Sequence, residues 1–279
     1  MRKPRLAAPV FVIGCSRSGT TVVYKTLSEA SELGSLQRET HDFWSELHPP
    51  AAKSWATHAL TAADASPLDR DRVERYFYSR LGARCFVDKN NQNGLCVPYL
   101  HALFPDARFV YVKRSPGDNI HSLIEGWGRS SEFATWSDTL PAEVRISGGA
   151  YRRWCFFLFD GWRDFLESPI ENVCAAQYMA MNEAILSARA AIPAGQWTEI
   201  FYEDLVRDPV GSFRAVFDAL GLRFGPHQET HCYNVLGTPY NAFSAIQIDK
   251  WKDQKNSACI ERILPLVGAV ARNMGYKLA

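Results

Sequence analysis

The 279-residue sequence is 47% hydrophobic and 22% charged, a balance typical of a globular protein with a sizeable core. Its 31 basic and 30 acidic residues leave a formal charge of +1, which predicts no attraction to nucleic acid or anionic membrane. The apolar runs are too short to span a bilayer, and the basic N-terminus leads into a predicted strand instead of a cleavable signal. Seven cysteines without a Cys-x-x-Cys pair predict neither a disulfide framework nor a metal site, so we expect a cytoplasmic protein.

Predicted strands and helices alternate along the chain, which indicates an α/β fold with a mostly parallel sheet flanked by helices. The predicted strands are residues 10–13, 85–87, 109–112 and 197–201. The predicted helices are residues 22–30, 95–104, 117–125, 150–166, 175–190, 211–220 and 258–273. We expect one domain over residues 1–279, with helical and loop insertions at about 45–80 and 126–195.

Residues 9–21, PVFVIGCSRSGTT, combine a short apolar strand with a turn rich in glycine and hydroxyl side chains. Gly14 and Gly19 have the G-x-x-x-x-G spacing that lets backbone N–H groups surround an anion between a strand and a helix. A nucleotide triphosphatase would carry lysine directly after the second glycine, where this chain has Thr20; the basic residue here is Arg17. The segment therefore predicts a site for a diphosphate-like anion without an obligatory metal.

A second anion site is predicted over residues 108–122, RFVYVKRSPGDNIHS. The strand ends in Lys113 and Arg114, and Pro116 then opens a helix, because proline is well tolerated in a first turn. Ser122 follows Arg114 by about two helical turns, so both side chains can face a pocket beyond the carboxyl end of the strand. Open α/β sheets bind their ligands in that position.

These two segments resemble the sulfotransferases that use 3′-phosphoadenosine 5′-phosphosulfate (PAPS). The arginine in the loop is most similar to the protein-tyrosine and bacterial small-molecule enzymes. The resemblance implies a P-loop-like fold, PAPS as cofactor, adenosine 3′,5′-bisphosphate (PAP) as product and no required metal. It further implies that Arg114 and Ser122 bind the 3′-phosphate. The residues that it places around the 5′-phosphosulfate are Arg17, Ser18, Gly19, Thr20 and Thr21.

Four residues are candidates for the chemistry: Glu39, His41, Lys89 and Arg17. Arg17 and Lys89 together could neutralise the sulfuryl oxygens and the bridging oxygen without a metal. Sulfuryl transfer needs a base for the acceptor proton, and the segment 37–44 carries Glu39 and His41, which would share one face if the segment were extended. The resemblance implies that Glu39 is the base. His41 remains an alternative because histidine titrates near neutral pH. Lys89 follows a predicted strand and matches a lysine that contacts the transferring group in relatives, although here Asn90 replaces the serine, threonine or aspartate common in the family.

Two later segments complete the resemblance. Tyr202 follows the last predicted strand and matches an adenine contact, while Lys250 and Trp251 match a pair that closes over the 3′-phosphate. The acceptor is a small molecule, peptide or glycan hydroxyl, which the sequence does not distinguish. The insertions should form its site, although aromatic residues there at helical spacing also fit a core. A P-loop small-molecule kinase and a nucleotide-binding protein without catalysis are the alternative functions.

Overall fold

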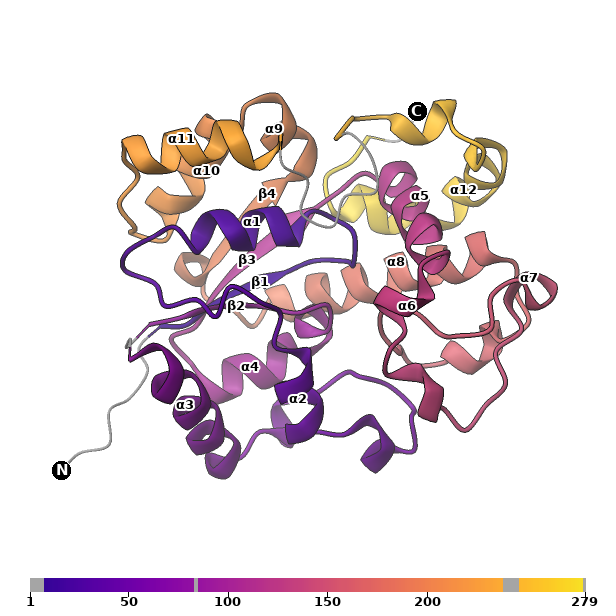
Figure 1. Ribbon diagram of the computed structural model, residues 1–279, viewed down its shortest axis with the longest axis horizontal. Helices are drawn as coiled ribbons and strands as arrows, with labels where there is room; N and C mark the ends of the chain where they lie inside the picture. Colours follow the sequence, from indigo (N-terminus) through magenta and orange to yellow (C-terminus); the bar gives the residue numbers. More distant parts are fainter. Residues whose placement is uncertain (1–7, 83–84, 238–245, 278–279) are drawn as a thin grey trace.

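The computed structural model describes residues 8–82, 85–237 and 246–277, and within them four strands form one parallel sheet (Figure 1). The strand order is β2–β1–β3–β4. In the central pairing, Val10 lies opposite Val87 on one side and Arg108 on the other. The strands are β1 (Val10–Ile13), β2 (Val87–Lys89), β3 (Arg108–Lys113) and β4 (Trp197–Phe201).

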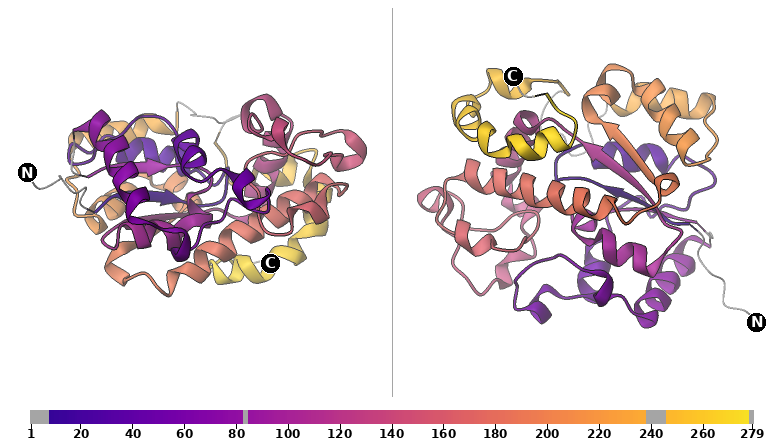
Figure 2. Two further views of the ribbon diagram at one scale, coloured as in Figure 1. Left: turned by 90° about the horizontal axis from the view of Figure 1, so that it is seen from below. Right: turned by 180° about the vertical axis from the view of Figure 1, so that it is seen from behind.

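The two faces of the sheet have separate cores because successive strand residues point to opposite sides. From β1, Val10 and Val12 pack into one core, while Phe11 and Ile13 pack into the other. The helices whose residues fill the first core are α1 (Thr20–Leu27), α10 (Pro209–Ala219) and α11 (Pro226–Val235). The principal helices of the second core are α4 (Val97–Leu103), α5 (Pro116–Trp127), α8 (Ile170–Arg189) and α12 (Ser257–Asn273). Figure 2 shows these layers from two further sides.

Shorter helices surround this framework. The α-helices are α2 (His41–Leu47), α3 (Pro67–Leu81), α6 (Ser130–Phe133), α7 (Ile146–Gly149) and α9 (Tyr202–Arg207). The 3₁₀ turns are η1 (Pro50–Lys53), η2 (Ala62–Asp64), η3 (Asn93–Cys96), η4 (Ser137–Thr139), η5 (Trp162–Phe165), η6 (Ala194–Gln196) and η7 (Lys250–Asp253). Helices α2, α6 and η7 lie beyond the carboxyl ends of the strands and contribute to the cavity described below.

The α/β fold with a parallel sheet is confirmed, and strands β1 and β4 have the predicted bounds. The predicted strand 85–87 begins two residues later, at Val87. The predicted helix 150–166 is wrong, because this stretch is irregular apart from η5. Its aromatic side chains Trp154, Phe156, Phe157 and Phe159 are buried without helical backbone, and Phe156 has a positive φ of 70°. The expected extended segment 37–44 is also wrong, because helix α2 begins at His41.

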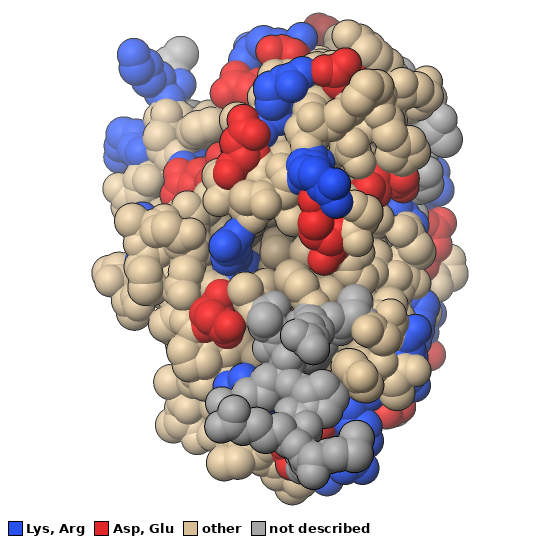
Figure 3. All heavy atoms as spheres, turned by 90° about the vertical axis from the view of Figure 1, so that its left-hand side faces the viewer, with Lys and Arg blue, Asp and Glu red and all other residues tan. Residues whose placement is uncertain are grey.

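Charge on the surface is mixed. In Figure 3 the basic and acidic side chains of one face alternate, and neither sign forms a continuous patch. This distribution accords with the formal charge of +1. Among the helices that the structure describes, none has both the length and the apolar character needed to cross a bilayer.

Candidate active site

A cavity of about 820 Å³ opens where the carboxyl ends of β1, β2 and β3 meet. Because the strands are parallel, the loops that follow them converge at this edge of the sheet. Most of the residues predicted from the sequence line this one cavity: Arg17, Gly19, Thr20, Thr21, Glu39, His41, Lys89, Arg114, Ser122, Tyr202 and Lys250. Ser18 and Trp251 are the predicted residues that do not line it.

The loop between β1 and α1 is a tight turn in which Ser18 N–H donates to the Cys15 carbonyl at 3.0 Å. Gly19 caps α1 with a φ of 99°, a conformation that favours glycine. A Cβ at this position would lie 2.4 Å from Cδ2 of the Tyr202 ring. Glycine is therefore required both by the backbone angle and by the close approach of the tyrosine. The first turn of α1 begins directly afterwards, at Thr20, on the wall of the cavity.

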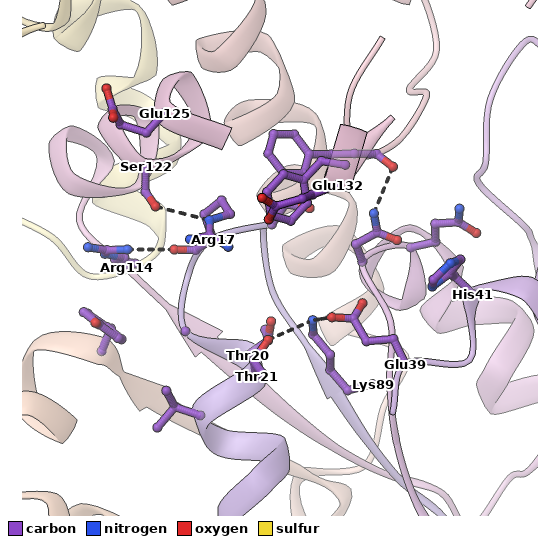
Figure 4. Close-up of a pocket in the computed structure, with 18 of the residues that line it drawn as sticks. Arg17, Thr20, Thr21, Glu39, His41, Lys89, Arg114, Ser122, Glu125 and Glu132 are labelled. Atoms are coloured by element: carbon purple, nitrogen blue, oxygen red, sulfur yellow. Dashed lines mark hydrogen bonds and ion pairs between the residues drawn. The ribbon is translucent and has the colours of Figure 1, made fainter. Parts of the chain in front are cut away.

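The two predicted anion sites form one continuous group. Arg17 donates from Nε to Ser122 Oγ at 3.3 Å, and Arg114 donates from Nη1 to the Arg17 carbonyl at 2.7 Å. The Arg114 guanidinium also lies 4.4 Å from the centre of the Tyr202 ring, a cation–π contact. Figure 4 shows Arg17, Arg114 and Ser122 together on one side of the cavity, with Glu39 and His41 on the other.

Burial lowers the pKa of Arg17 to about 10, and the neighbouring charge of Arg114 contributes to the shift. Arg17 therefore remains protonated at neutral pH, although it lies in a partly desolvated position beside a second cation. An anionic ligand would favour this charged form. Binding of an anion beside Arg17 would therefore raise its pKa back towards the ordinary value.

Several polar atoms around this group are buried without a hydrogen-bond partner in the described part of the chain. They are Ser16 Oγ, Ser18 Oγ and Arg114 Nε. Buried polar groups are normally paired, because an unpaired one loses its hydrogen bonds to water without compensation. Phosphate or sulfate oxygens accept hydrogen bonds from hydroxyl and guanidinium donors, so the unpaired atoms of Ser16 and Arg114, two residues that line the cavity, fit a phosphorylated ligand.

The other side of the cavity contains an ion pair. Lys89 Nζ lies 2.6 Å from Glu39 Oε1 and donates to Thr21 Oγ1 at 3.2 Å. The Lys89 side chain is 7% exposed and the Glu39 side chain 29%. The pair therefore connects a carboxylate at the cavity surface with the first turn of α1.

Asp88 helps to position Glu39 through hydrogen bonds to the neighbouring Thr40 and to Trp44. Its fully buried carboxylate accepts hydrogen bonds from Thr40 Oγ1 and from Trp44 Nε1, the second at 3.1 Å. Burial raises the pKa of Asp88, while these hydrogen bonds oppose the shift. They fasten the start of α2 to the end of β2. Glu39, one residue before Thr40, is thereby held beside Lys89.

His41 begins α2 and lines the cavity, but its surroundings differ from those of Glu39. Its Nε2 lies 3.0 Å from Asp42 Oδ1, and its side chain is 45% exposed. The shared face that an extended segment would have given Glu39 and His41 does not exist here. Both nevertheless reach the same cavity, because the turn from Glu39 into the helix follows its wall.

Trp251 packs outside the cavity. It is buried against the start of α5, where a Cβ on Gly117 would lie 2.3 Å from its Nε1. Its backbone N–H donates to Asp118 Oδ1 at 3.3 Å. Trp251 thus fastens η7 to α5, and the neighbouring Lys250 lines the cavity.

Sequence reasoning missed several cavity residues. Asn91 and Gln92 follow β2, and Phe133 lies at the end of α6. His121 and Glu125 come from the same helix as Ser122, where a spacing of three or four residues could have indicated them. Of the aromatic residues noted in the middle of the chain, Trp136 and Phe156 line the cavity, whereas the others lie in the core: Trp127, Trp154, Phe157, Phe159 and Trp162.

Comparisons with known proteins agree with this fold. The profile described as the sulfotransferase family matches residues 9–226, more than half of the chain, and the chain belongs to that family. The nodulation protein NoeE of Sinorhizobium fredii is 27% identical over 133 residues, which cover 42% of this chain and 31% of that protein. The match thus spans about a third of the length of this relative.

Solved structures share the fold at low sequence identity. The sulfotransferase domain of the Synechococcus PCC 7002 olefin synthase has a TM-score of 0.58 and 17% identity, covering 100% of this chain and 98% of that one. STF9 of Mycobacterium avium has a TM-score of 0.57 and 15% identity, covering 98% and 78%. Mouse SULT7A1, crystallised with PAP, has a TM-score of 0.51 and 13% identity, covering 95% and 85%.

Proposed function

We propose that this protein transfers a sulfuryl group from PAPS to a hydroxyl of an acceptor. The observation that carries the proposal is the arrangement of one cavity. Two arginines and a serine lie on one side, and a Glu39–Lys89 pair joined to α1 lies on the other. A nucleotide with phosphates at both ends of its ribose and an acceptor hydroxyl can occupy such a cavity together.

The cofactor-binding roles follow from chemistry. Thr20 and Thr21, with Ser18 behind them, lie at the start of α1, where the helix dipole favours an anion such as the 5′-phosphosulfate. Arg114 and Ser122 offer charge-assisted contacts to the 3′-phosphate, and Lys250 offers a further charge. Tyr202, whose ring already stacks on a guanidinium, provides an aromatic surface for adenine. Trp251 acts through its neighbour, because it fixes η7 and so the position of Lys250.

The catalytic roles fall on the opposite wall. When bound, PAPS supplies the sulfuryl group: the acceptor oxygen bonds to sulfur as the bond from sulfur to the 5′-phosphate oxygen breaks, which leaves PAP. Glu39 takes the acceptor proton as general base. Lys89 and Arg17 stabilise the negative charge that develops on the leaving phosphate and the sulfuryl oxygens. These cations would do so without a metal ion.

Glu39 is preferred to His41 because of its contacts. Glu39 is ion-paired with Lys89 and so lies next to the residue proposed to stabilise the transferring group. His41 instead interacts with Asp42 and is more exposed to solvent. A base must lie within hydrogen-bond reach of the proton that it removes. Glu39 is linked through Lys89 to Thr21 at the start of α1, where the phosphosulfate is proposed to bind.

The alternative functions make different predictions. A P-loop small-molecule kinase requires a lysine on the β- and γ-phosphates, and this chain has Thr20 at that position. A nucleotide-binding protein without catalysis would not need the Glu39–Lys89 pair. Two findings favour the transferase. The chain belongs to the sulfotransferase family, and a neighbour of the same fold was crystallised with PAP.

The experiment is a transfer assay with ³⁵S-labelled PAPS and a panel of hydroxyl acceptors, run beside γ-³²P-labelled ATP with Mg²⁺. We expect labelled sulfate esters to form together with PAP, and no labelled phosphate esters. Phosphate transfer from ATP would establish the kinase alternative. Binding of PAP without any transfer over the panel would favour the non-catalytic alternative.

A further inference from the structure

We propose that the acceptor is a polyhydroxylated ring, a sugar of a glycoside or glycan. This inference rests on the proposed sulfotransferase function. It concerns the part of the cavity beyond the Glu39–Lys89 pair, here called the acceptor chamber. The chamber is formed by the cavity-lining residues of segments 41–45, 91–92 and 132–136, and by Phe156.

Polar side chains with planar or small heads dominate the chamber. They are His41, Asp42, Ser45, Asn91, Gln92, Glu132 and Thr135. Among the described residues that line the whole cavity, only Val22 and Ile246 have aliphatic side chains, and both lie outside the chamber. An alkyl or steroid-like acceptor would be expected to bind to aliphatic walls. The chamber instead offers the hydrogen-bonding groups that a ring with several hydroxyls requires.

A group of aromatic rings complements these polar groups. Phe133 and Trp136 are partly exposed, whereas Phe156, at 2% exposure, packs behind them in the core. The rings of Phe133 and Phe156 lie 5.2 Å apart between centres, and Trp136 lines the same chamber. Phe156 keeps a positive φ of 70° because two hydrogen bonds hold it. Its N–H donates to the Phe133 carbonyl, and its carbonyl accepts from Asn91 Nδ2, each at 2.9 Å. These two contacts fix the Phe156 backbone in the wall of the chamber. Sugar rings present C–H faces that pack against such aromatic surfaces.

Two unpaired atoms point to hydroxyl groups in the ligand. Asn91 Oδ1 and Trp136 Nε1 are buried and have no hydrogen-bond partner in the part of the chain that the structure describes. The orientation of the Asn91 amide is fixed, since only its NH₂ group can donate to the Phe156 carbonyl. Asn91 Oδ1 therefore needs a hydrogen-bond donor, and Trp136 Nε1–H needs an acceptor. Hydroxyl groups provide both, whereas a purely apolar acceptor would leave both atoms unpaired.

The sugar hydroxyl that reacts would lie at Glu39, and its ring would extend towards Asn91, Trp136 and Phe156. The reaction balances as for any O-sulfation. The hydroxyl oxygen gains the sulfuryl group, its proton goes to Glu39, and PAP leaves with the electron pair of the broken bond. A phenol would place one hydroxyl at Glu39 and leave the remaining polar groups of the chamber unused.

The test compares methyl β-glycosides and β-1,4-linked disaccharides with 4-nitrophenol and 1-octanol. Binding to the protein saturated with PAP is followed by saturation-transfer NMR, and sulfation is followed with ³⁵S-labelled PAPS. We expect at least one glycoside to bind and to be sulfated in preference to the phenol and the alkanol. Preference for either of those, or binding of PAP with no glycoside bound, would overturn the inference. Failure of PAP itself to bind would instead contradict the proposed function.

A substitution locates the sugar. Trp136→Phe removes the indole N–H and keeps an aromatic ring, so the KM for the glycoside should rise about 3- to 10-fold, the value of one neutral hydrogen bond. The affinity for PAP should not change. Tyr78→Phe, a substitution at an exposed position on α3, is the matched control and should change neither quantity. An unchanged KM in Trp136→Phe would contradict the placement of the sugar in the acceptor chamber.

Discussion

Lys89 joins the two sides of the cavity. It contacts the carboxylate of Glu39 at 2.6 Å and the hydroxyl of Thr21 at 3.2 Å, so one ammonium group connects the proposed base with the anion-binding end of α1. A nearly buried ammonium group in this position can stabilise negative charge both on the carboxylate and on a bound anion during transfer. This arrangement assigns separate roles to Lys89, Glu39 and Arg17, which substitutions can distinguish.

Glu39→Gln should lower kcat by about 10²- to 10⁴-fold, the range for a positioned acid–base group. The affinity for PAP should be little changed, because the substitution removes a negative charge that an anionic ligand does not need. His41→Ala, which lies two residues away and also lines the cavity, is the comparison. Steady-state kinetics on both variants decides the assignment. A large loss of kcat in His41→Ala with near-normal Glu39→Gln would identify histidine as the base.

Arg17 and Lys89 should differ in which kinetic constant they affect. Arg17→Ala should reduce both PAP affinity and kcat, because Arg17 belongs to the group that we propose binds the ground-state nucleotide. Lys89→Ala should lower mainly kcat. The activation free energy should rise by about 3 to 4 kcal/mol, the value of a preorganised donor. Arg17→Lys should keep partial activity, since it retains the charge without the planar guanidinium. An unchanged kcat in Lys89→Ala would place that residue outside the reaction.

The loop between β1 and α1 depends on an element far away in the sequence. Gly19 lies against the ring of Tyr202, which begins α9 after the last strand of the sheet. The parallel order β1–β3–β4 brings these two strand ends to the same edge. The position of Tyr202 and the shape of the anion-binding loop are therefore coupled through packing.

Gly19→Ala should weaken PAP binding by at least about tenfold and destabilise the fold by about 1 to 3 kcal/mol. The added Cβ would lie 2.4 Å from the Tyr202 ring in a backbone conformation of φ 99°. Gly195→Ala is the matched control, because a Cβ there meets nothing within 4 Å. Calorimetry and urea denaturation measure the two effects. Equal behaviour of the two variants would show that the loop does not need its glycine.

Short apolar runs in the sequence predicted strands β1 and β3 well. The apolar run before Gly14 predicted β1, and the strand ending at Lys113 was predicted to within one residue at each end. The stretch around Phe156 was misread as a helix, because a continuous aromatic run has the same appearance whether it is buried in a helix or in an irregular segment.

The sequence predicted which residues line the site better than it predicted which of them contact one another. The motifs named the residues at the strand ends, and the fold brings most of them to one cavity. The pairing of Lys89 with Glu39 joins residues 50 positions apart, and that of Arg17 with Ser122 joins residues 105 apart. Such contacts depend on the order of strands in the sheet. No local pattern encodes that order.

The wall of the acceptor chamber depends on a buried junction behind it. His58 N–H donates to the Leu158 carbonyl at 3.1 Å, and its Nδ1 accepts from Leu158 N–H at 2.7 Å. The His58 ring also packs against Trp136, with 4.9 Å between ring centres. The segment that carries Phe156 is thus connected to residues almost a hundred positions earlier in the chain.

Burial lowers the pKa of His58 from 6.5 to about 4. Because the unfolded chain binds the proton more readily, this contribution to stability is complete above about pH 6.5 and is lost as the pH falls towards 4. Between pH 6.5 and pH 4, the unfolding free energy of His58→Asn should therefore fall by about 3 kcal/mol less than that of the wild type. Urea denaturation at several pH values measures it, with the exposed His227→Asn as control. Parallel curves for His58→Asn and the wild type would contradict the assignment.

The most direct test of the central claim is calorimetric titration with PAP and with ADP in the absence of Mg²⁺. The combined Arg17, Arg114 and Ser122 group predicts that PAP binds at least about tenfold more tightly, because ADP lacks the 3′-phosphate. Arg114→Ala should weaken PAP by about 1.5 to 3 kcal/mol, the value of a hydrogen bond to a charged group, and leave ADP nearly unaffected. Equal affinity of the wild-type protein for PAP and ADP would contradict the account.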